Sequence, residues 1–265
     1  MKIGFVQFAP ALGRLEATMQ ALERLIPRAA GASLLVLPEL CNSGYNFRSA
    51  EEAWRTSEEV GDSVFLRLLA SLCREHGFHI VSGFNERQGD HLYNSAVLVG
   101  PDGYVGRYRK LHLFMNEKDF FEPGDEGLPV FDIGACRLGM LVCFDWIFPE
   151  AWRILAMKGA DVICHPSNLV LPGLAQRAVP IRALTNRVYV VTANRIGSEG
   201  DLTFTGMSTI ADPKGDLLAQ APPAEEAVTV VDADVGLARD KKITARNDLF
   251  ADRRPDAYGM LLAGG

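Results

Sequence analysis

An internal duplication constrains the fold of this 265-residue chain more than any other feature of its sequence. Four segments of the first half recur in the second half, in the same order and with similar gaps between them. The matched pairs are IGFVQF (3–8) with LGMLVC (138–143), GASLLVLP (31–38) with GADVICHP (159–166), FHIVSGF (78–84) with VYVVTAN (188–194), and AVLVGPDG (96–103) with STIADPKG (208–215). Because the segments recur as an ordered set, the sequence predicts that both halves fold as the same unit.

Each half is predicted to form one α/β unit. An apolar strand leads to a helix and then to a short buried strand that ends at a proline, after which a second helix and a pair of strands close the unit. Apolar residues recur at helical spacing at Leu15, Met19 and Leu22 in the first half, and at Trp152 and Leu155 in the second. The alternation of strands and helices favours an α/β fold.

Strands such as Leu34–Leu37 are apolar at every position, so we expect both of their faces to be covered. Two sheets of this kind, each with helices on its outer face, would pack face to face into a four-layer α-β-β-α sandwich. We therefore expect residues 1–265 to form a single domain, in which the residues from about 236 to 265 form a C-terminal arm.

The charge balance argues against a nucleic-acid-binding protein. The chain has 27 Lys and Arg against 33 Asp and Glu, a net charge of −6, whereas such proteins need a basic surface to displace counterions. The densest basic cluster, Lys241-Lys242 with Arg246, is interrupted by Asp240 and Asp248 and is interpreted as a solvated loop.

Other features favour a cytoplasmic protein that does not bind membranes. No apolar run approaches the roughly 20 residues that span a bilayer, and Gln7, Pro10 and Arg14 interrupt any signal-peptide core. The chain contains five cysteines, an odd number, and they have no CxxC spacing. This usage is typical of reduced thiols in the cytoplasm.

Three reactive residues follow predicted strands. Glu39 comes after the strand Leu34–Leu37, Cys143 ends the strand Leu138–Val142, and Lys110 follows the strands that close the first half. In open sheets, functional groups gather beyond the carboxyl ends of strands, so we expect these three side chains to meet.

A carboxylate, an ammonium and a thiol together suit acyl transfer. A thiol has a reference pKa of about 8.5, so it needs a base or a nearby cation to react well at neutral pH. Glu39 can accept the proton of Cys143 and later deliver it to a leaving amine. Lys110 can stabilise the oxyanion of a tetrahedral intermediate, an effect worth on the order of 3–4 kcal/mol for one donor.

Structural explanations compete with these assignments. A cysteine in an apolar strand is usually a small core residue, and this interpretation suits the other four cysteines, Cys41, Cys73, Cys136 and Cys164. Glu39 could equally cap a helix, and Lys110 could lie in a solvated loop.

The histidines suggest neither a protease nor a metal site. Cys164 and His165 are adjacent on a predicted strand, so their side chains face opposite ways and cannot readily form a catalytic dyad. The five histidines (76, 79, 91, 112 and 165) lack the spacing of metal ligands, so we expect no metal.

Three blocks of the sequence resemble the nitrilase superfamily of carbon–nitrogen hydrolases, and the likeness extends over nearly the whole chain. The blocks are PEL (38–40) with SGY (43–45), RKLHLF (109–114), and LVCFDWIFPE (141–150). The resemblance implies the four-layer α-β-β-α sandwich built from two duplicated halves, and an enzyme without metal or cofactor. It also implies pairing into a homodimer or a higher homo-oligomer, through the helix after the nucleophile and the C-terminal arm.

The resemblance implies a role for each reactive residue. Glu39 matches the general base, Lys110 the oxyanion partner and Cys143 the nucleophile. Glu117 matches a second glutamate that orients the lysine and the substrate, and its neighbour Glu122 stands in a Phe-Glu-Pro-Gly setting that is typical of a turn. The residues that we expect to contact substrate are Tyr45, Phe144, Trp146 and Asn168.

The implied function is an amidase that converts a short amide to a carboxylic acid and ammonia through a thioester. The alternatives are a nitrilase acting on small aliphatic nitriles, an N-carbamoyl amide hydrolase, an acyltransferase, and an inactive binding or scaffold protein on the same fold. Branches that bind a substrate carboxylate often place an arginine after the cysteine, where this chain has Phe144 and Asp145. We therefore expect a substrate without a carboxylate, unless Arg177, Arg182 or Arg195 reaches the pocket.

Overall fold

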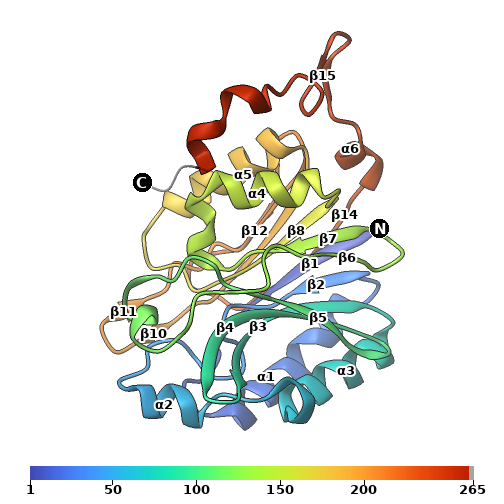
Figure 1. Ribbon diagram of the computed structural model, residues 1–265. Helices are drawn as coiled ribbons and strands as arrows, with labels where there is room; N and C mark the ends of the chain where they lie inside the picture. Colours follow the sequence, from blue (N-terminus) through green and yellow to red (C-terminus); the bar gives the residue numbers. More distant parts are fainter. Residues whose placement is uncertain (263–265) are drawn as a thin grey trace.

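Two six-stranded sheets lie face to face at the centre of the structure, a computed structural model that describes residues 1–262 (Figure 1). The first sheet has the order β14 (Ala227–Asp232), β1 (Lys2–Gln7), β2 (Leu34–Val36), β3 (His79–Gln88), β4 (His91–Gly100), β5 (Gly103–Arg109). The second has the order β13 (Leu217–Gln220), β12 (Thr209–Ala211), β9 (Tyr189–Asn194), β8 (Val162–Ser167), β7 (Arg137–Met140), β6 (Val130–Asp132).

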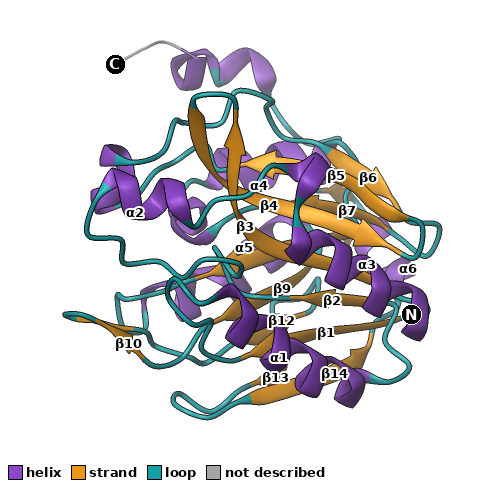
Figure 2. Ribbon diagram, turned by 90° about the horizontal axis from the view of Figure 1, so that it is seen from below, coloured by secondary structure: helices purple, strands orange, loops and turns teal. Residues whose placement is uncertain are grey.

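Helices cover the outer face of each sheet. Helices α1 (Leu15–Leu25) and α3 (Val64–His76) lie across the first sheet (Figure 2), and α4 (Pro149–Met157) and α5 (Leu174–Asn186) cover the second (Figure 1). The four-layer α-β-β-α sandwich predicted from the sequence is confirmed. The remaining elements are short: α2 (Ala50–Arg55), β10 (Ser198–Glu199), β11 (Leu202–Thr203), α6 (Val235–Arg239), β15 (Lys242–Thr244) and β16 (Asn247–Asp248).

The core explains why β2 is apolar throughout. Leu34 and Val36 pack in the cluster that fills the space between the sheets, whereas Leu35 packs in the cluster under α1 and α3. Leu22 of α1 belongs to the same outer cluster, and the cluster that contains Leu34 and Val36 extends to Trp152 of α4. The strand is therefore covered on both faces, as expected.

The duplication appears directly in the topology. The four matched segments form β1 and β7, β2 and β8, β3 and β9, and β4 and β12. In each sheet the first three of these strands run parallel and the fourth runs antiparallel to the third. Equivalent strands therefore end at equivalent positions in the two sheets.

The edge of each sheet differs from the prediction, in which a pair of strands closes each half. Three strands follow the second helix in each half, because β5 and β13 also join their sheets. A further strand crosses to the other half: β6 pairs with β7, and β14 pairs with β1, both antiparallel. The strands β6 and β14 were missed because they are partly exposed and lack a buried apolar run.

The C-terminal segment runs over the helices of the second sheet (Figure 1). Lys241 Nζ donates to the carbonyl oxygens of Asn186 at 3.2 Å and Arg187 at 2.7 Å, where α5 ends. The interpretation of Lys241 as part of a solvated loop is therefore wrong, because this ammonium satisfies helix-terminal carbonyls. Residues 263–265, the end of the predicted arm, lie outside the described residues. Within residues 1–262, no helix has the length and apolar character that crossing a membrane requires.

Gly83 of β3 supports the loop that carries Glu39, and it offers a test of this packing. A Cβ at Gly83 would lie 2.3 Å from Glu39 Cα and 2.4 Å from Leu40 N. Gly83→Ala should therefore lower the free energy of unfolding by about 1–3 kcal/mol through overpacking, which a urea titration would measure. Gly61→Ala is the control, because a Cβ there meets no atom within 4 Å. Equal stability of the two variants would contradict the prediction.

Candidate active site

Glu39, Lys110 and Glu117 meet in one buried cluster. Lys110 Nζ donates to Glu39 Oε1 at 2.7 Å and to Glu117 Oε1 at 2.8 Å. The exposed fractions of the three side chains are 0%, 0% and 4% respectively. Lys110 is thus neither a solvated loop residue nor an isolated charge, and Glu39 and Lys110 meet as expected from the strand ends.

The glutamate at the end of β2 is held by polar groups from both sheets. Asn94 Nδ2 of β4 donates to Glu39 Oε1 at 2.8 Å, and Asn168 Nδ2 donates to the backbone carbonyl of Glu39 at 3.0 Å. Leu40, the next residue, has a φ of 45°, which turns the chain sharply after the carboxylate. Glu39 Oε2 is buried and has no hydrogen-bond partner among residues 1–262. One carboxylate oxygen is therefore available for proton transfer.

Cys143 begins a tight 3-10 turn, Cys143–Ile147, directly after β7. Its φ of 43° lies in the left-handed region, which a residue with a Cβ seldom adopts and which is common at functional sites. His165 Nε2 lies 2.8 Å from the carbonyl oxygen of Cys143. Burial lowers the pKa of His165 to about 4, so the neutral ring donates this hydrogen bond from Nε2. His165 was considered as a partner for Cys164 and as a metal ligand, and its support of the Cys143 turn was missed.

The electrostatic environment keeps the Cys143 thiol protonated. Burial raises its pKa well above the ordinary value, the charge of Glu39 raises the pKa further, and Lys110 opposes both effects. The backbone N–H of Asn168 hydrogen-bonds to the sulfur and also lowers the pKa. The other four cysteines are buried in the described structure, in agreement with their interpretation as core residues.

Glu117 is held from two further directions. Tyr45 donates its hydroxyl to Glu117 Oε1 at 2.8 Å, and the backbone N–H of Phe114 donates to Glu117 Oε2 at 3.2 Å. Burial raises the pKa of Glu117 to about 6, although Lys110 opposes the shift. Glu122, the alternative in the sequence, is 58% exposed and lies beside His91 instead. The structure thus places Glu117 in the cluster and Glu122 outside it.

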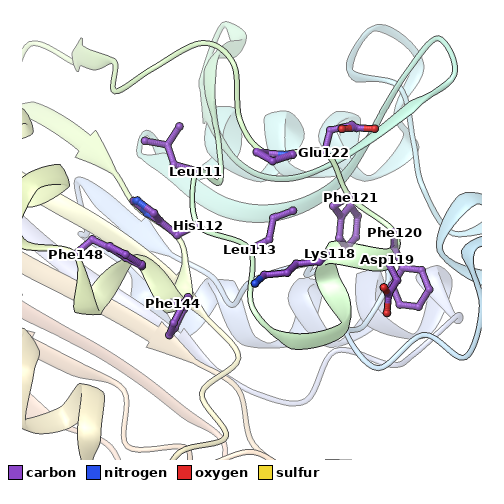
Figure 3. Close-up of a pocket in the computed structure, with 11 residues that line it drawn as sticks. Leu111, His112, Leu113, Lys118, Asp119, Phe120, Phe121, Glu122, Phe144 and Phe148 are labelled. Carbon is purple, nitrogen blue, oxygen red and sulfur yellow. The ribbon is translucent and has the colours of Figure 1, made fainter. Parts of the chain in front are cut away.

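A cavity of about 530 Å³ opens between the Cys143 turn and the loop that contains Glu117 (Figure 3). Aromatic and aliphatic side chains dominate its wall, and the charged side chains of Lys118, Asp119 and Glu122 also line it. A smaller cavity of about 50 Å³ is lined by Tyr45 and Glu117, and shares Phe120 and Phe121 with the larger one. The two cavities therefore flank the loop from residue 115 to residue 123; Glu117 lines the smaller one, and Glu39, Lys110 and Cys143 line neither.

The four predicted substrate contacts lie in different places. Phe144 lines the larger cavity, and Tyr45 lines the smaller one. Asn168 is buried against Glu39, with its Oδ1 unpartnered among residues 1–262. Trp146 packs in the core and lines neither cavity, so its proposed contact with substrate stays a prediction.

The charged groups near the cysteine do not face the larger cavity. Asp145 is fully buried and accepts hydrogen bonds from other side chains, so its expected repulsion of an anionic substrate finds no support. Arg195 pairs with the buried Glu199, Arg182 donates to the backbone carbonyls of Trp146 and Ile147, and Arg177 is exposed. None of the three arginines lines either cavity.

In residues 1–262, no group of three or more His, Cys, Asp or Glu could hold a metal ion.

Comparison with known proteins decides the family. The family model described as carbon-nitrogen hydrolase matches residues 2–242. The chain belongs to this family. A nitrilase from Pyrococcus abyssi is 49% identical to this carbon–nitrogen hydrolase over 260 residues, which cover 97% of this chain and 99% of that protein. An N-carbamoylputrescine amidase from Solanum tuberosum is 34% identical and covers 91% of this chain, with 88% of its own length matched.

A solved structure of an amidase is similar to this chain in fold and has an active site cysteine. A mutant of the amidase from Nesterenkonia sp. AN1, described as carrying acrylamide added at its active site cysteine, aligns with a TM-score of 0.82 and 26% identity. The alignment covers 98% of this chain and 99% of the amidase. The resemblance to the nitrilase superfamily is confirmed, and this carbon–nitrogen hydrolase is a hydrolase of amide- or nitrile-type bonds.

The pKa of Cys143 should respond to its neighbours in a defined direction. Burial and the charge of Glu39 both raise this pKa, so Glu39→Gln removes a negative charge, favours the thiolate and lowers the pKa. The rate of iodoacetamide alkylation of the Cys143 peptide, followed against pH by mass spectrometry, should show a lower midpoint. Glu75→Gln, at an exposed carboxylate that lines neither cavity, is the control. An unchanged or higher midpoint in Glu39→Gln would count against the described electrostatics.

Proposed function

We propose that this carbon–nitrogen hydrolase is an amidase that converts a short neutral amide to a carboxylic acid and ammonia, with Cys143 as nucleophile. The observation that carries the proposal is the buried Glu39–Lys110–Glu117 cluster, whose charges act directly on the Cys143 thiol. A proton acceptor, a fixed cation and a nucleophile are the groups that acyl transfer to a thiol needs.

Acylation begins with the neutral thiol. Because the pKa of Cys143 is raised, the thiolate forms only as Glu39 takes the proton, and the unpartnered Oε2 is the oxygen suited to accept it. The sulfur attacks the amide carbonyl, and the oxyanion is held by Lys110 and by the backbone N–H of Phe144. Glu39 then returns the proton to the leaving nitrogen, and ammonia departs from a thioester.

Deacylation uses the same glutamate in the opposite direction. Glu39 removes a proton from a water molecule, and the resulting hydroxide attacks the thioester carbonyl. The second tetrahedral intermediate collapses to the carboxylic acid, and the proton held by Glu39 returns to the sulfur of Cys143. The cycle needs no redox partner and restores every protonation state.

Glu117 keeps Lys110 charged and in place. Burial lowers the pKa of Lys110, but the charges of Glu117 and Glu39 outweigh this effect and raise it overall. The ammonium therefore stays protonated throughout the cycle. Tyr45 fixes the position of Glu117 through its hydroxyl, which makes Tyr45 part of the support of the cation.

Unpartnered acceptors favour an amide over a nitrile. Glu39 Oε2, Asn94 Oδ1 and Asn168 Oδ1 are buried around the cluster and have no partner among residues 1–262. A primary amide offers two N–H donors to such groups, whereas a nitrile nitrogen offers none. Buried acceptors without a donor are costly, so binding an amide satisfies groups that a nitrile leaves unsatisfied.

Nitrile hydrolysis is the second candidate, because the Pyrococcus abyssi relative, 49% identical, is described as a nitrilase. A nitrile would be attacked by the same sulfur and would pass through a thioimidate before hydrolysis. Product analysis on matched amide and nitrile pairs separates the two functions. Hydroxamate formation with added hydroxylamine measures acyl transfer to an amine in the same assay.

We also propose a cytoplasmic homodimer or higher homo-oligomer. The support is the apolar outer surface of α4 and α5, where Ile154, Met157, Ile181 and Leu184 are 42%, 48%, 51% and 40% exposed. Exposed apolar patches of this kind are typical of protein contacts. Five free cysteines support a reducing compartment.

Loss of the lysine charge should act on the chemical step. Lys110→Met should lower kcat by about a hundredfold or more, because an oxyanion donor acts mainly in the transition state. Ammonia release under saturating amide would measure this effect. Lys214→Met, at an exposed turn residue, should leave kcat unchanged. A Lys110→Met enzyme with near-normal kcat would remove Lys110 from the mechanism.

Substrate charge provides the test of the pocket. The larger cavity contains one lysine against two acids and no arginine, so a substrate carboxylate would lack a bidentate partner. We expect kcat/KM to be higher for a neutral aliphatic amide than for an N-carbamoyl amino acid. A preference of about tenfold or more for the carbamoyl acid, equal to about 1.4 kcal/mol, would overturn this description of the pocket.

A further inference from the structure

The segment that carries Lys110 and the turn that carries Cys143 are joined by one buried carboxylate. Asp145, two residues after Cys143, accepts from Tyr108 Oη at 2.8 Å through Oδ2 and lies 2.7 Å from His112 Nδ1 through Oδ1. Tyr108 and His112 stand two residues before and two residues after Lys110. Both flanks of the lysine are therefore tied to the same side chain.

Asp145 also shapes the turn around the nucleophile. The backbone N–H of Val142 donates to Asp145 Oδ2 at 2.8 Å, and Trp152 Nε1 donates to the Asp145 carbonyl oxygen at 2.9 Å. The carboxylate thus closes the turn in which Cys143 adopts its strained backbone conformation. A buried carboxylate is costly without partners, and the Asp145 carboxylate is compensated by Tyr108, His112 and the N–H of Val142.

His112 is fixed on its other face as well. Its ring stacks on Phe148 at a centroid distance of 3.6 Å and an interplanar angle of 10°. The side chain is 30% exposed and lines the larger cavity (Figure 3). The ring is held between Asp145 and Phe148, which leaves the lysine segment little freedom to move relative to the turn.

We propose that Tyr108, His112 and Asp145 form a clamp that sets the position of the Lys110 ammonium relative to the Cys143 sulfur. The inference rests on the proposed function, because it assigns positioning residues to that reaction. The hydrogen bonds of the ammonium itself go to Glu39 and Glu117, not to the nucleophile turn. A displacement of about 1 Å in a catalytic group can cost on the order of a hundredfold in rate. The clamp therefore acts on kcat.

A matched pair of substitutions separates the hydrogen bond from the bulk of the ring. His112→Asn keeps an N–H donor near the position of Nδ1, whereas His112→Leu has similar bulk and no donor. We expect His112→Leu to lower kcat by about tenfold or more with KM within about twofold, and His112→Asn to stay within about threefold of wild type. His91→Leu, at an exposed histidine outside the site, is the control and should keep the wild-type kcat.

Tyr108→Phe tests the other arm of the clamp by removing one oxygen atom. It should lower kcat in the same way, and the Tyr108→Phe/His112→Leu double variant should lose less than the product of the single losses, because the two residues share Asp145. Should His112→Leu fail to fold, the kcat of Tyr108→Phe alone tests the proposed clamp. A normal kcat in the folded variants, an equal loss in His112→Asn and His112→Leu, or an effect confined to KM would overturn the proposal.

Alkylation of Cys143 separates failure of the clamp from failure of the proposed function. Displacement of the ammonium raises the pKa of the thiol, so iodoacetamide should label Cys143 more slowly in His112→Leu than in His112→Asn at the same pH. This readout needs no substrate. If the wild-type enzyme releases no ammonia from any amide, the proposed function fails, whereas equal labelling rates in the two variants refute the clamp.

Discussion

The ion cluster in which Lys110 is shared by Glu39 and Glu117 is the interaction on which the site depends. Its three members come from the end of β2, the end of β5 and the 3-10 turn at Met115–Asp119, so the cluster joins segments that no single strand pairing connects. Removal of one partner from a buried ion pair leaves the other charge buried without a partner, at a cost of several kcal/mol. Burial is the main reason that the pKa of the Cys143 thiol is raised, and the two carboxylates of the cluster add to this effect while the single ammonium opposes it.

The strain of the nucleophile turn is tolerated because both sides of Cys143 are anchored. The preceding N–H binds Asp145, and the carbonyl of Cys143 binds the neutral His165. A left-handed conformation at a residue with a side chain costs about 1–3 kcal/mol and persists only where the surroundings hold it. Sheet packing thus supplies the rigidity that the chemistry uses, since His165 belongs to the central strand β8.

The sequence was sufficient for the layers of the fold and for the meeting of Glu39, Lys110 and Glu117, because the duplicated apolar strands and the three motif blocks are local patterns. It was insufficient for groups whose partners are distant along the chain. Asn94 reaches Glu39 only through the register of β3 and β4, and Lys241 reaches the end of α5 across 54 residues. The partly exposed edge strands lack the alternation of apolar and polar residues from which a strand is predicted. Their pairing depends on the assembled sheets.

The reciprocal placement of β6 and β14 makes the two halves of the chain mutually dependent. Each half completes the sheet of the other, so a fragment that ends near residue 133 would lack the strand that borders β1 and would carry β6 without its neighbour. The duplication therefore does not preserve two independent folding units. Contacts between Met1 and Ala233, 232 residues apart, close the first sheet only after nearly the whole chain has been synthesised. We expect such a topology to fold slowly and to unfold as one cooperative unit.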